Sequence, residues 1–131
     1  MKYMLDTNIC IYIINNKPAH VTARFRQFTP GDIGLSAITA AELAFGVEKS
    51  GSSRNHNALE KFMAPLEILA LDETVIWHYA RICTQLEQAG QAIGALDTLI
   101  AAHAITHNLT LVSNNTREFA RVPGLQLENW A

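Results

Sequence analysis

The chain has 131 residues, of which 49% are hydrophobic and 17% are charged. This length and apolar content predict one folded domain spanning residues 1–131, and they exclude a disordered or fibrous polymer. Ten Lys and Arg residues against twelve Asp and Glu residues give a net charge of −2, which excludes nucleic-acid binding by bulk positive charge alone. No apolar run of membrane-spanning length and no signal-peptide pattern occur, so we expect a cytoplasmic protein with no membrane partner.

The predicted elements alternate between strands and helices along the chain. Short apolar runs predict strands over residues 2–5, 33–35, 67–71, 109–112 and 125–127. Helical spacing predicts helices over residues 9–14, 21–28, 37–47, 57–66, 73–89 and 95–107, followed by a polar loop over 113–122 that has room for a short helix. Ser36 and Asp72 are the expected N-caps of two helices. Strands joined by helices predict an α/β fold with a mostly parallel sheet between two helical layers.

Several common kinds of site are excluded or disfavoured. Cys10 and Cys83 lie in apolar stretches without metal-ligand or redox spacing, which predicts two buried thiols in a reducing compartment. His103 and His107 are four residues apart, but the glutamate of a zinc-protease motif is missing between them, which favours packed or exposed histidines. The chain contains no nucleophile elbow, P-loop or dinucleotide-binding fingerprint.

Three acidic side chains stand where ligands or metals are often held. Asp6 directly follows the first predicted strand, at the sheet edge where ligands collect, although an N-cap role is the plain alternative. Glu42 lies in an apolar helix without a basic residue three or four positions away, and ordinary exposure is its alternative. Asp97 begins an alanine-rich helix, where the helix dipole alone would favour it.

Polar residues also follow the fourth predicted strand, beginning at Ser113. They are expected at the same sheet edge as Asp6, and Asn115 with Glu118 also fits a capping box. Carboxylate and amide oxygens are the ligands that Mg²⁺ and Mn²⁺ prefer. Such an ion lowers the pKa of a bound water and neutralises charge on a phosphate, so the predicted chemistry is metal-assisted hydrolysis of a phosphodiester.

Four segments, in this order and at these separations, make the chain resemble the PIN-domain ribonucleases, and within them the VapC toxins of type II toxin–antitoxin (VapBC) pairs. The segments are MLDTN at 4–8, SAITAAEL at 36–43 followed by Gly46, GALDTLIAAHA at 94–104 and LVSNNTREF at 111–119. The resemblance implies an α/β/α sandwich, a homodimer and a metal-dependent endonuclease acting on structured RNA. It also implies a cognate VapB-type antitoxin whose tail covers the site.

The resemblance also assigns roles to individual residues. Asp6, Glu42 and Asp97 match the three acidic positions that gather Mg²⁺ or Mn²⁺ in the family. Asn115 stands where many members carry a further acid, and Glu118 is close enough in sequence to supply the missing charge. Supporting polar positions of the family are matched by Asn8 and Ser113.

The resemblance also implies cleavage of tRNA in the anticodon loop, with initiator tRNA as a candidate substrate and inhibited translation as the result. Exposed loop bases suit a small domain with few basic residues. With water as the nucleophile, the products carry a 5′-phosphate and a 3′-hydroxyl. The candidate phosphate contacts, for which plain solvated charge is an equal alternative, are Arg117, Arg121, Lys49, Arg54 and Lys17.

The antitoxin is expected to occupy an apolar groove between the early helices and to insert an arginine among the acids. The residues expected around this groove are Ile11, Ile14, Phe25, Phe45 and Val47, for which core packing is the alternative.

Two other functions compete with the nuclease. A receiver-like signalling domain also binds Mg²⁺ with acids at strand ends, but Asp6 has no acidic neighbour and no lysine follows Lys61. A degenerate RNA-binding PIN domain is the second alternative, in which Asn115 marks a lost metal site.

Overall fold

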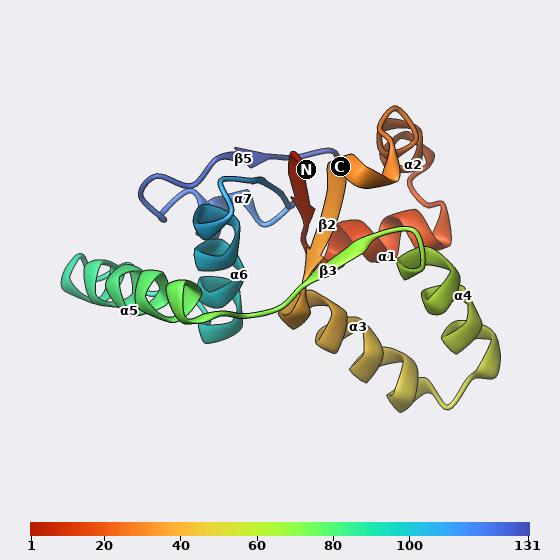
Figure 1. Cartoon of the computed structure of the whole chain (residues 1–131), viewed down its shortest axis with the longest axis horizontal. Helices are drawn as coiled ribbons and strands as arrows, with labels where there is room; N and C mark the ends of the chain where they lie inside the picture. The colour runs from red at the N-terminus through yellow and green to blue at the C-terminus, as the bar shows by residue number, and fades with distance from the viewer.

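The computed structural model describes residues 1–131 and contains one five-stranded sheet with helices on both faces (Figure 1). The sheet order is β3-β2-β1-β4-β5, and every neighbouring pair is parallel. The strands are β1 (Tyr3–Leu5), β2 (Ile33–Ser36), β3 (Glu67–Leu69), β4 (Thr110–Val112) and β5 (Leu127–Glu128). The predicted α/β fold with a parallel sheet is therefore confirmed.

Seven α-helices and one 3-10 turn connect the strands. They are α1 (Thr7–Asn15), α2 (Ala19–Phe25), η1 (Pro30–Asp32), α3 (Ala37–Ser50), α4 (Ser53–Met63), α5 (Glu73–Gln88), α6 (Ala95–Thr106) and α7 (Thr116–Phe119). The order of the parallel strands differs from the flavodoxin-like order of a receiver domain, in which the first strand lies between the second and third. Here β1 lies between β2 and β4, which argues against the receiver-like alternative.

Side chains at helix starts explain where several helices begin. Ser36 accepts a hydrogen bond from the Ile38 amide at 3.1 Å, and Asp72 accepts one from the Val75 amide at 3.1 Å, so both predicted N-caps are confirmed. The predicted start of the fourth helix, residue 57, was four residues too late, because α4 begins at Ser53. Ser52 caps this helix by accepting from the Asn55 amide at 3.2 Å, which lets it begin at Ser53.

The core is divided into two clusters by the alternation of side chains along the strands. Met4 and Leu111 belong to the cluster under α5 and α6, whereas Leu5 and Val112 belong to the cluster under α1 and α4. The sheet is therefore buried on both faces, and its central strands end in the interior of the molecule. This arrangement places the residues that follow β1, β2 and β4 along one edge of the sheet.

The two cysteines differ in their surroundings. Cys10 is buried as predicted, and burial raises the pKa of its thiol, with the charge of Asp6 adding to the effect. Cys83 is only half-buried, so the prediction of a second buried thiol was wrong. It lies on α5, which extends beyond the edge of the sheet (Figure 1). The amphipathic sequence pattern of this helix does not show which of its turns lack other elements packed against them. None of the helices is long and apolar enough to cross a membrane.

Candidate active site

Asp6 lies at the carboxyl end of β1 with 6% of its surface exposed. It occupies the N-cap position of α1, but its side chain makes no capping hydrogen bond. Instead Ser113, which follows β4, donates its hydroxyl to Asp6 Oδ2 at 2.7 Å. Neither of the ion pairs in the chain involves this buried carboxylate. The capping alternative does not account for this side chain.

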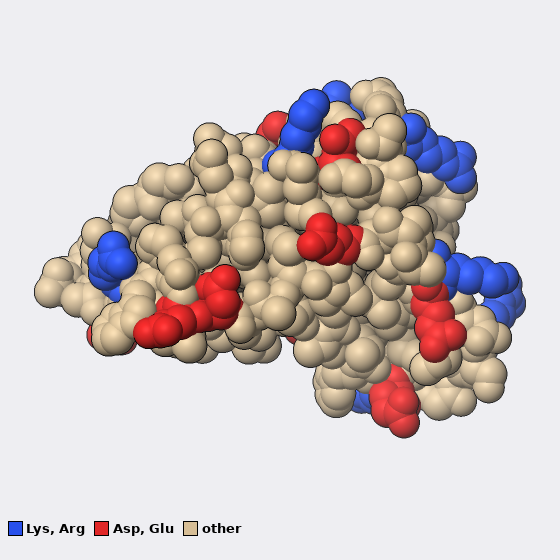
Figure 2. All heavy atoms as spheres, in the orientation of Figure 1, with Lys and Arg blue, Asp and Glu red and all other residues tan.

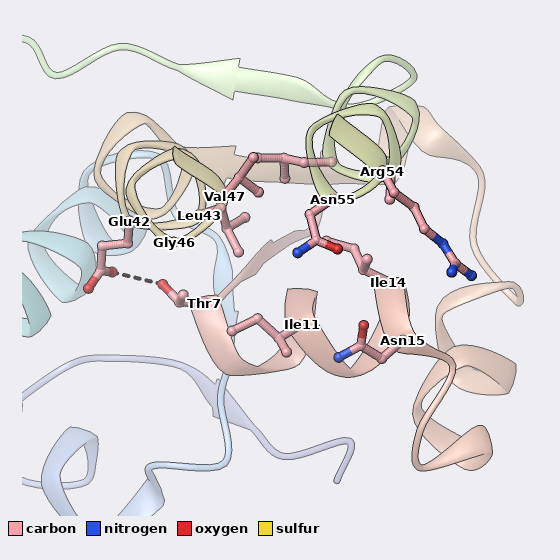
Figure 3. Close-up of a pocket in the computed structure, with 12 residues that line it drawn as sticks. Thr7, Ile11, Ile14, Asn15, Glu42, Leu43, Gly46, Val47, Arg54 and Asn55 are labelled. Atoms are coloured by element: carbon pink, nitrogen blue, oxygen red, sulfur yellow. Dashed lines mark hydrogen bonds between the residues drawn. The ribbon is translucent and has the colours of Figure 1, made fainter. Parts of the chain in front are cut away.

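Glu42 projects from the second turn of α3 and is held by α1. Thr7, the first residue of α1, donates its hydroxyl to Glu42 Oε1 at 2.7 Å (Figure 3). Thr7 follows Asp6 directly, so this contact connects the end of β1 with the acid on α3. Sequence reasoning missed the role of Thr7, because nothing in the spacing of MLDTN indicates that its hydroxyl reaches a helix 35 residues away.

Asp97 lies in the first turn of α6, and the charges of the other predicted acids affect the pKa of its carboxyl group. Burial raises its pKa to about 6, and the charges of Asp6, Glu118 and Glu42 contribute in that order. Like charges disfavour ionisation only when they are close, so the predicted acids gather around Asp97. The ion pairs of the chain, Arg24 with Glu128 and His56 with Glu60, lie elsewhere. The acids therefore face one another without a cationic side chain between them.

The polar residues after β4 form a connected loop. Ser113 accepts a hydrogen bond from the Asn115 amide at 3.0 Å while it donates to Asp6. Asn115 occupies the N-cap position of α7 without a capping hydrogen bond, and its Nδ2 donates to Glu118 Oε2 at 3.3 Å. Asn8, by contrast, is exposed and makes no side-chain hydrogen bond to any of the acids. Of the two predicted supporting residues, only Ser113 contacts a carboxylate.

The set of side chains fits a hard divalent cation in its chemistry. No three Asp, Glu, His or Cys side chains converge closely enough to form a complete metal cage. Mg²⁺ does not require one, because it binds through one or two carboxylates and keeps several waters. Burial and, after it, the charges of Asp6, Glu118 and Glu42 raise the pKa of Asp97, and a cation would offset this negative charge. Asp6, Asp97 and Glu42 are the residues that would hold the ion.

A groove with a volume of about 680 Å³ begins at Glu42 and runs between α1, α3 and α4 (Figure 3). Its apolar walls include Ile11 and Ile14 from α1 and Val47 from α3, and Arg54 of α4 also lines it. Ile11, Ile14 and Val47 were predicted to line such a groove. The prediction of the other two residues, Phe25 and Phe45, was wrong.

The two misplaced aromatic residues have different surroundings. Phe25 packs against the core and lies 5.9 Å from the Phe62 ring, because α2 turns this side chain inward. Phe45 is 68% exposed and does not line the groove. Val47, which does line the groove, is two positions further along the chain. This spacing places the two side chains on different faces of α3.

Basic side chains do not form a continuous patch on the face shown in Figure 2, where Lys and Arg side chains are scattered at the periphery. Of the candidate phosphate contacts, Arg54 lines the groove and Arg117 is exposed on α7, whereas Arg121 donates to the Ala92 carbonyl at 3.3 Å. This distribution agrees with the low net charge, and it leaves nucleic-acid binding to individual contacts.

Comparison with known proteins identifies the class of protein that this fold and site define. The sequence matches the PIN domain family over residues 3–125, and the chain belongs to that family. Its relatives within the family carry the name VapC. A Shigella flexneri protein named tRNA(fMet)-specific endonuclease VapC is 42% identical over 132 aligned residues, covering 100% of this chain and 99% of the relative.

Two solved structures agree with this placement. A structure of VapBC2 from Rickettsia felis bound to a promoter DNA fragment has a chain that is 43% identical, with a TM-score of 0.92 and complete coverage of both chains. A structure of DNA-bound VapBC from Salmonella typhimurium has a chain that is 42% identical, with a TM-score of 0.94 and coverage of 100% of this chain and 99% of the other. The resemblance described from the sequence is confirmed at the level of the family.

Proposed function

We propose that the protein, acting as one PIN domain over residues 1–131, is a metal-dependent endoribonuclease toxin of a VapBC pair. The observation that carries this proposal is the raised pKa of Asp97, which results from burial and from the charges of Asp6, Glu118 and Glu42. Such a cluster is unfavourable without a cation and is suited to holding one against a phosphate. The VapC names of the full-length relatives support the nuclease assignment.

The proposed site divides its work among the side chains described above. When bound, Mg²⁺ or Mn²⁺ supplies a lowered pKa for a coordinated water and neutralises charge on the scissile phosphate. Asp6, Asp97 and Glu42 would hold the ion. Ser113 keeps Asp6 in one orientation, and Thr7 does the same for Glu42. With water as the nucleophile, the products carry a 5′-phosphate and a 3′-hydroxyl.

Asn115 and Glu118 act together in this proposal as the fourth polar position. Asn115 contributes a neutral amide, and its hydrogen bond directs the Glu118 carboxylate at 3.3 Å. Glu118 also contributes to the raised pKa of Asp97, so its charge acts at the cluster. We assign Glu118 the charge that the family acid would supply. Asn8 is assigned a contact with solvent or RNA, because it is exposed.

The proposed substrate is tRNA, cut in the anticodon loop, with initiator tRNA as the first candidate. The name of the Shigella relative, a tRNA(fMet)-specific endonuclease, supports this choice. A domain with a net charge of −2 is suited to a few contacts with splayed loop bases rather than to a long duplex. Cleavage of this substrate inhibits translation and takes place in the cytoplasm.

The proposed antitoxin partner is a VapB-type protein whose segment occupies the groove next to Glu42. The apolar walls at Ile11, Ile14 and Val47 suit apolar side chains, and Glu42 at one end suits an arginine. An arginine there would offset the carboxylate cluster in place of a metal. The solved VapBC complexes of the similar chains support a partner of this kind.

The proposed homodimer uses the exposed apolar side chains around β3 and α5. Ile76 and Trp77 on α5 are 57% and 61% exposed, and Ile68 and Leu71 beside them in sequence are 45% and 39% exposed. Large exposed apolar side chains are suited to an interaction site, and β3 is an edge strand with a free side. A second copy would cover both features by a symmetric contact.

The test of the proposed nuclease is cleavage of total tRNA and of initiator tRNA by the purified protein with Mg²⁺ or Mn²⁺. EDTA and Asp6→Asn are the controls, and both ends of each product are mapped. We expect discrete metal-dependent cuts that Asp6→Asn abolishes, with 5′-phosphate and 3′-hydroxyl ends. Intact RNA under all conditions, with a protein that still binds Mg²⁺, would contradict the nuclease. A 2′,3′-cyclic phosphate would contradict water as the nucleophile.

A further inference from the structure

His103 on α6 is a buried polar side chain that the proposed chemistry does not use. None of its surface is exposed, and its Nδ1 lies 2.7 Å from Ser36 Oγ. Its other ring nitrogen, Nε2, is buried without a hydrogen-bond partner. A buried imidazole that is only half satisfied is less favourable than an apolar side chain of similar size. Packing alone therefore does not explain a histidine at this position.

The partner of His103 is the residue that begins the helix carrying Glu42. Ser36 ends β2 and caps α3, where its Oγ accepts from the Ile38 amide at 3.1 Å. One hydroxyl thus contacts α6 through His103 and the first turn of α3 through Ile38. Asp97 lies on α6 and Glu42 on α3, so the contact joins the two acid-bearing helices away from the carboxylates themselves.

The surroundings of the ring determine the direction of this hydrogen bond. Burial lowers the pKa of His103 and the neighbouring His107 lowers it further, whereas the Ala70 carbonyl opposes the shift. The ring is therefore neutral, with a hydrogen on one nitrogen only. The Ser36 hydroxyl accepts from the Ile38 amide and has one hydrogen of its own, which donation to Nδ1 uses, so the ring hydrogen is assigned to Nε2. Nδ1 then accepts from Ser36, whose lone pairs stay available to Ile38.

Helix α3 contacts α1, α4, α6, β2 and β3, but few of its own side chains are fully buried. Only Thr39 and Leu43 are buried among its residues Ala37–Ser50. The helix leaves the end of β2 and extends away from the sheet (Figure 1). The Ser36 cap and the hydrogen bond from Thr7 to Glu42 add to this packing, and they act at the end of α3 that carries Glu42.

We infer that His103 is a positioning residue: by holding the Ser36 hydroxyl at the start of α3, it sets where Glu42 lies relative to Asp97. This inference rests on the proposed metal-dependent activity, because the position of Glu42 matters for the metal and the substrate. Its effect is exerted through Ser36 and the helix, without contact to the reacting atoms. A residue that orients a metal ligand typically contributes a factor of roughly 10 to 100 to metal affinity or activity.

Matched variants of His103 test the inference in the full chain. In His103→Asn the side-chain oxygen replaces Nδ1 as an acceptor for Ser36, whereas His103→Leu fills similar space without an acceptor. His107→Asn is the control at the exposed C-cap position that follows α6. The readouts are the Mn²⁺ dissociation constant without RNA, kcat and KM for tRNA cleavage, and the melting temperature.

We expect His103→Leu to weaken Mn²⁺ binding and to lower kcat by about tenfold each, with KM nearly unchanged. For His103→Asn and His107→Asn, the Mn²⁺ dissociation constant and kcat are expected to stay within about threefold of those of the unmodified protein. If His103 only filled space, the smaller His103→Asn side chain would not preserve them. If His103→Asn and His103→Leu lost Mn²⁺ affinity and kcat equally, or if neither lost them while the unmodified protein was active, the inference would be overturned and the proposed function would stand. An unmodified protein that neither cleaves RNA nor binds Mn²⁺ would overturn the proposed function, and the inference with it.

A second measurement uses the unmodified protein and does not depend on how the variants fold. Nitrogen-15 NMR of the histidine rings distinguishes a protonated from an unprotonated ring nitrogen. We expect His103 to carry its hydrogen on Nε2, with Nδ1 unprotonated at neutral pH, and the Ser36 hydroxyl proton to exchange slowly with water. A hydrogen on Nδ1 would mean that the ring donates to Ser36, and it would overturn the assigned direction of the bond.

Discussion

The two helices that carry Glu42 and Asp97 are held in different ways. Helix α6 has six buried residues among its twelve, from Thr98 to Ala104, and they pack directly on the sheet. Helix α3 has two buried residues among its fourteen, and hydrogen bonds at its start add to its packing against α1 and α4. One acid of the proposed site therefore lies on a helix with a largely buried face, and the other on a more exposed helix whose position depends more on polar contacts.

The largest expected effect of this difference is on catalysis. Burial and, after it, the charges of three other carboxylates raise the pKa of Asp97, whereas Glu42 is half-buried at the end of the groove. We expect Asp97→Asn to lower tRNA cleavage by more than about 100-fold, beyond the typical effect of a residue that only supports a metal ligand. Glu42→Gln is expected to have a smaller effect, measured by single-turnover cleavage with saturating Mg²⁺. A larger loss in Glu42→Gln would reverse the assignment of the central ligand.

Truncation of buried and exposed side chains compares the packing of the two helices. Ile100 on α6 is fully buried, so Ile100→Ala should lower the free energy of unfolding by about 2 to 5 kcal/mol. Phe45 on α3 is 68% exposed, and Phe45→Ala should change it by less than about 0.5 kcal/mol. Urea unfolding followed by circular dichroism measures both values. A large loss in Phe45→Ala, growing with protein concentration, would show instead that this side chain is buried in an oligomer.

The polar attachment of α3 is tested at Thr7. Thr7→Val keeps the shape of the side chain but removes the donor to Glu42 Oε1, and we expect about tenfold slower cleavage with little change in melting temperature. Thr7→Ser keeps the hydroxyl and is the matched control, expected to remain within about threefold of the unmodified protein. Equal cleavage by Thr7→Val and Thr7→Ser would mean that Glu42 does not need this hydrogen bond.

The same difference explains what the sequence could and could not predict. Apolar periodicity and capping residues such as Ser36 and Asp72 are local, and they were sufficient to predict the strands, most helices and the parallel sheet. Asp6 and Asp97 could be selected because they follow or begin an element, and Glu42 because no basic residue stands three or four positions from it in an apolar helix. The contacts from Thr7 to Glu42 and from His103 to Ser36 span 35 and 67 residues, and single-residue types carry no information about such long-range pairs.

The groove shows the same limit in an apolar setting. Ile11, Ile14 and Val47 were correctly expected to line it, whereas Phe25 points into the core and Phe45 into solvent. All five are apolar residues on early helices, so composition does not separate them. Their roles depend on how α1, α2 and α3 are rotated about their axes, which is decided by contacts between helices.

The smallest expected effect concerns the stability of the metal-free protein as a function of pH. The pKa of Asp97 is raised to about 6 in the folded state, mainly by burial and then by the charges of Asp6, Glu118 and Glu42, above the value of about 4 in an unfolded chain. Between these values the folded state binds more protons than the unfolded state, so the contribution of Asp97 to stability is present below pH 4 and is lost as the pH rises through 6. Asp97→Asn removes this loss, because the amide does not ionise.

Without metal, Asp97→Asn should therefore be more stable than the unmodified protein at pH 7.5, and the difference should vanish near pH 4. Because solvent screens a side chain that is only half-buried, we expect a difference of about 1 kcal/mol in the free energy of unfolding, well below the full equivalent of the pKa shift. Chemical unfolding in EDTA at the two pH values measures it, with Glu67→Gln at an exposed carboxylate of β3 as the control. Adding Mg²⁺ at pH 7.5 should stabilise the unmodified protein more than Asp97→Asn, since the ion offsets the repulsion that the substitution removes. If Asp97→Asn were less stable at pH 7.5, the carboxylate would be compensated within the fold, and the acids would have no need of a cation.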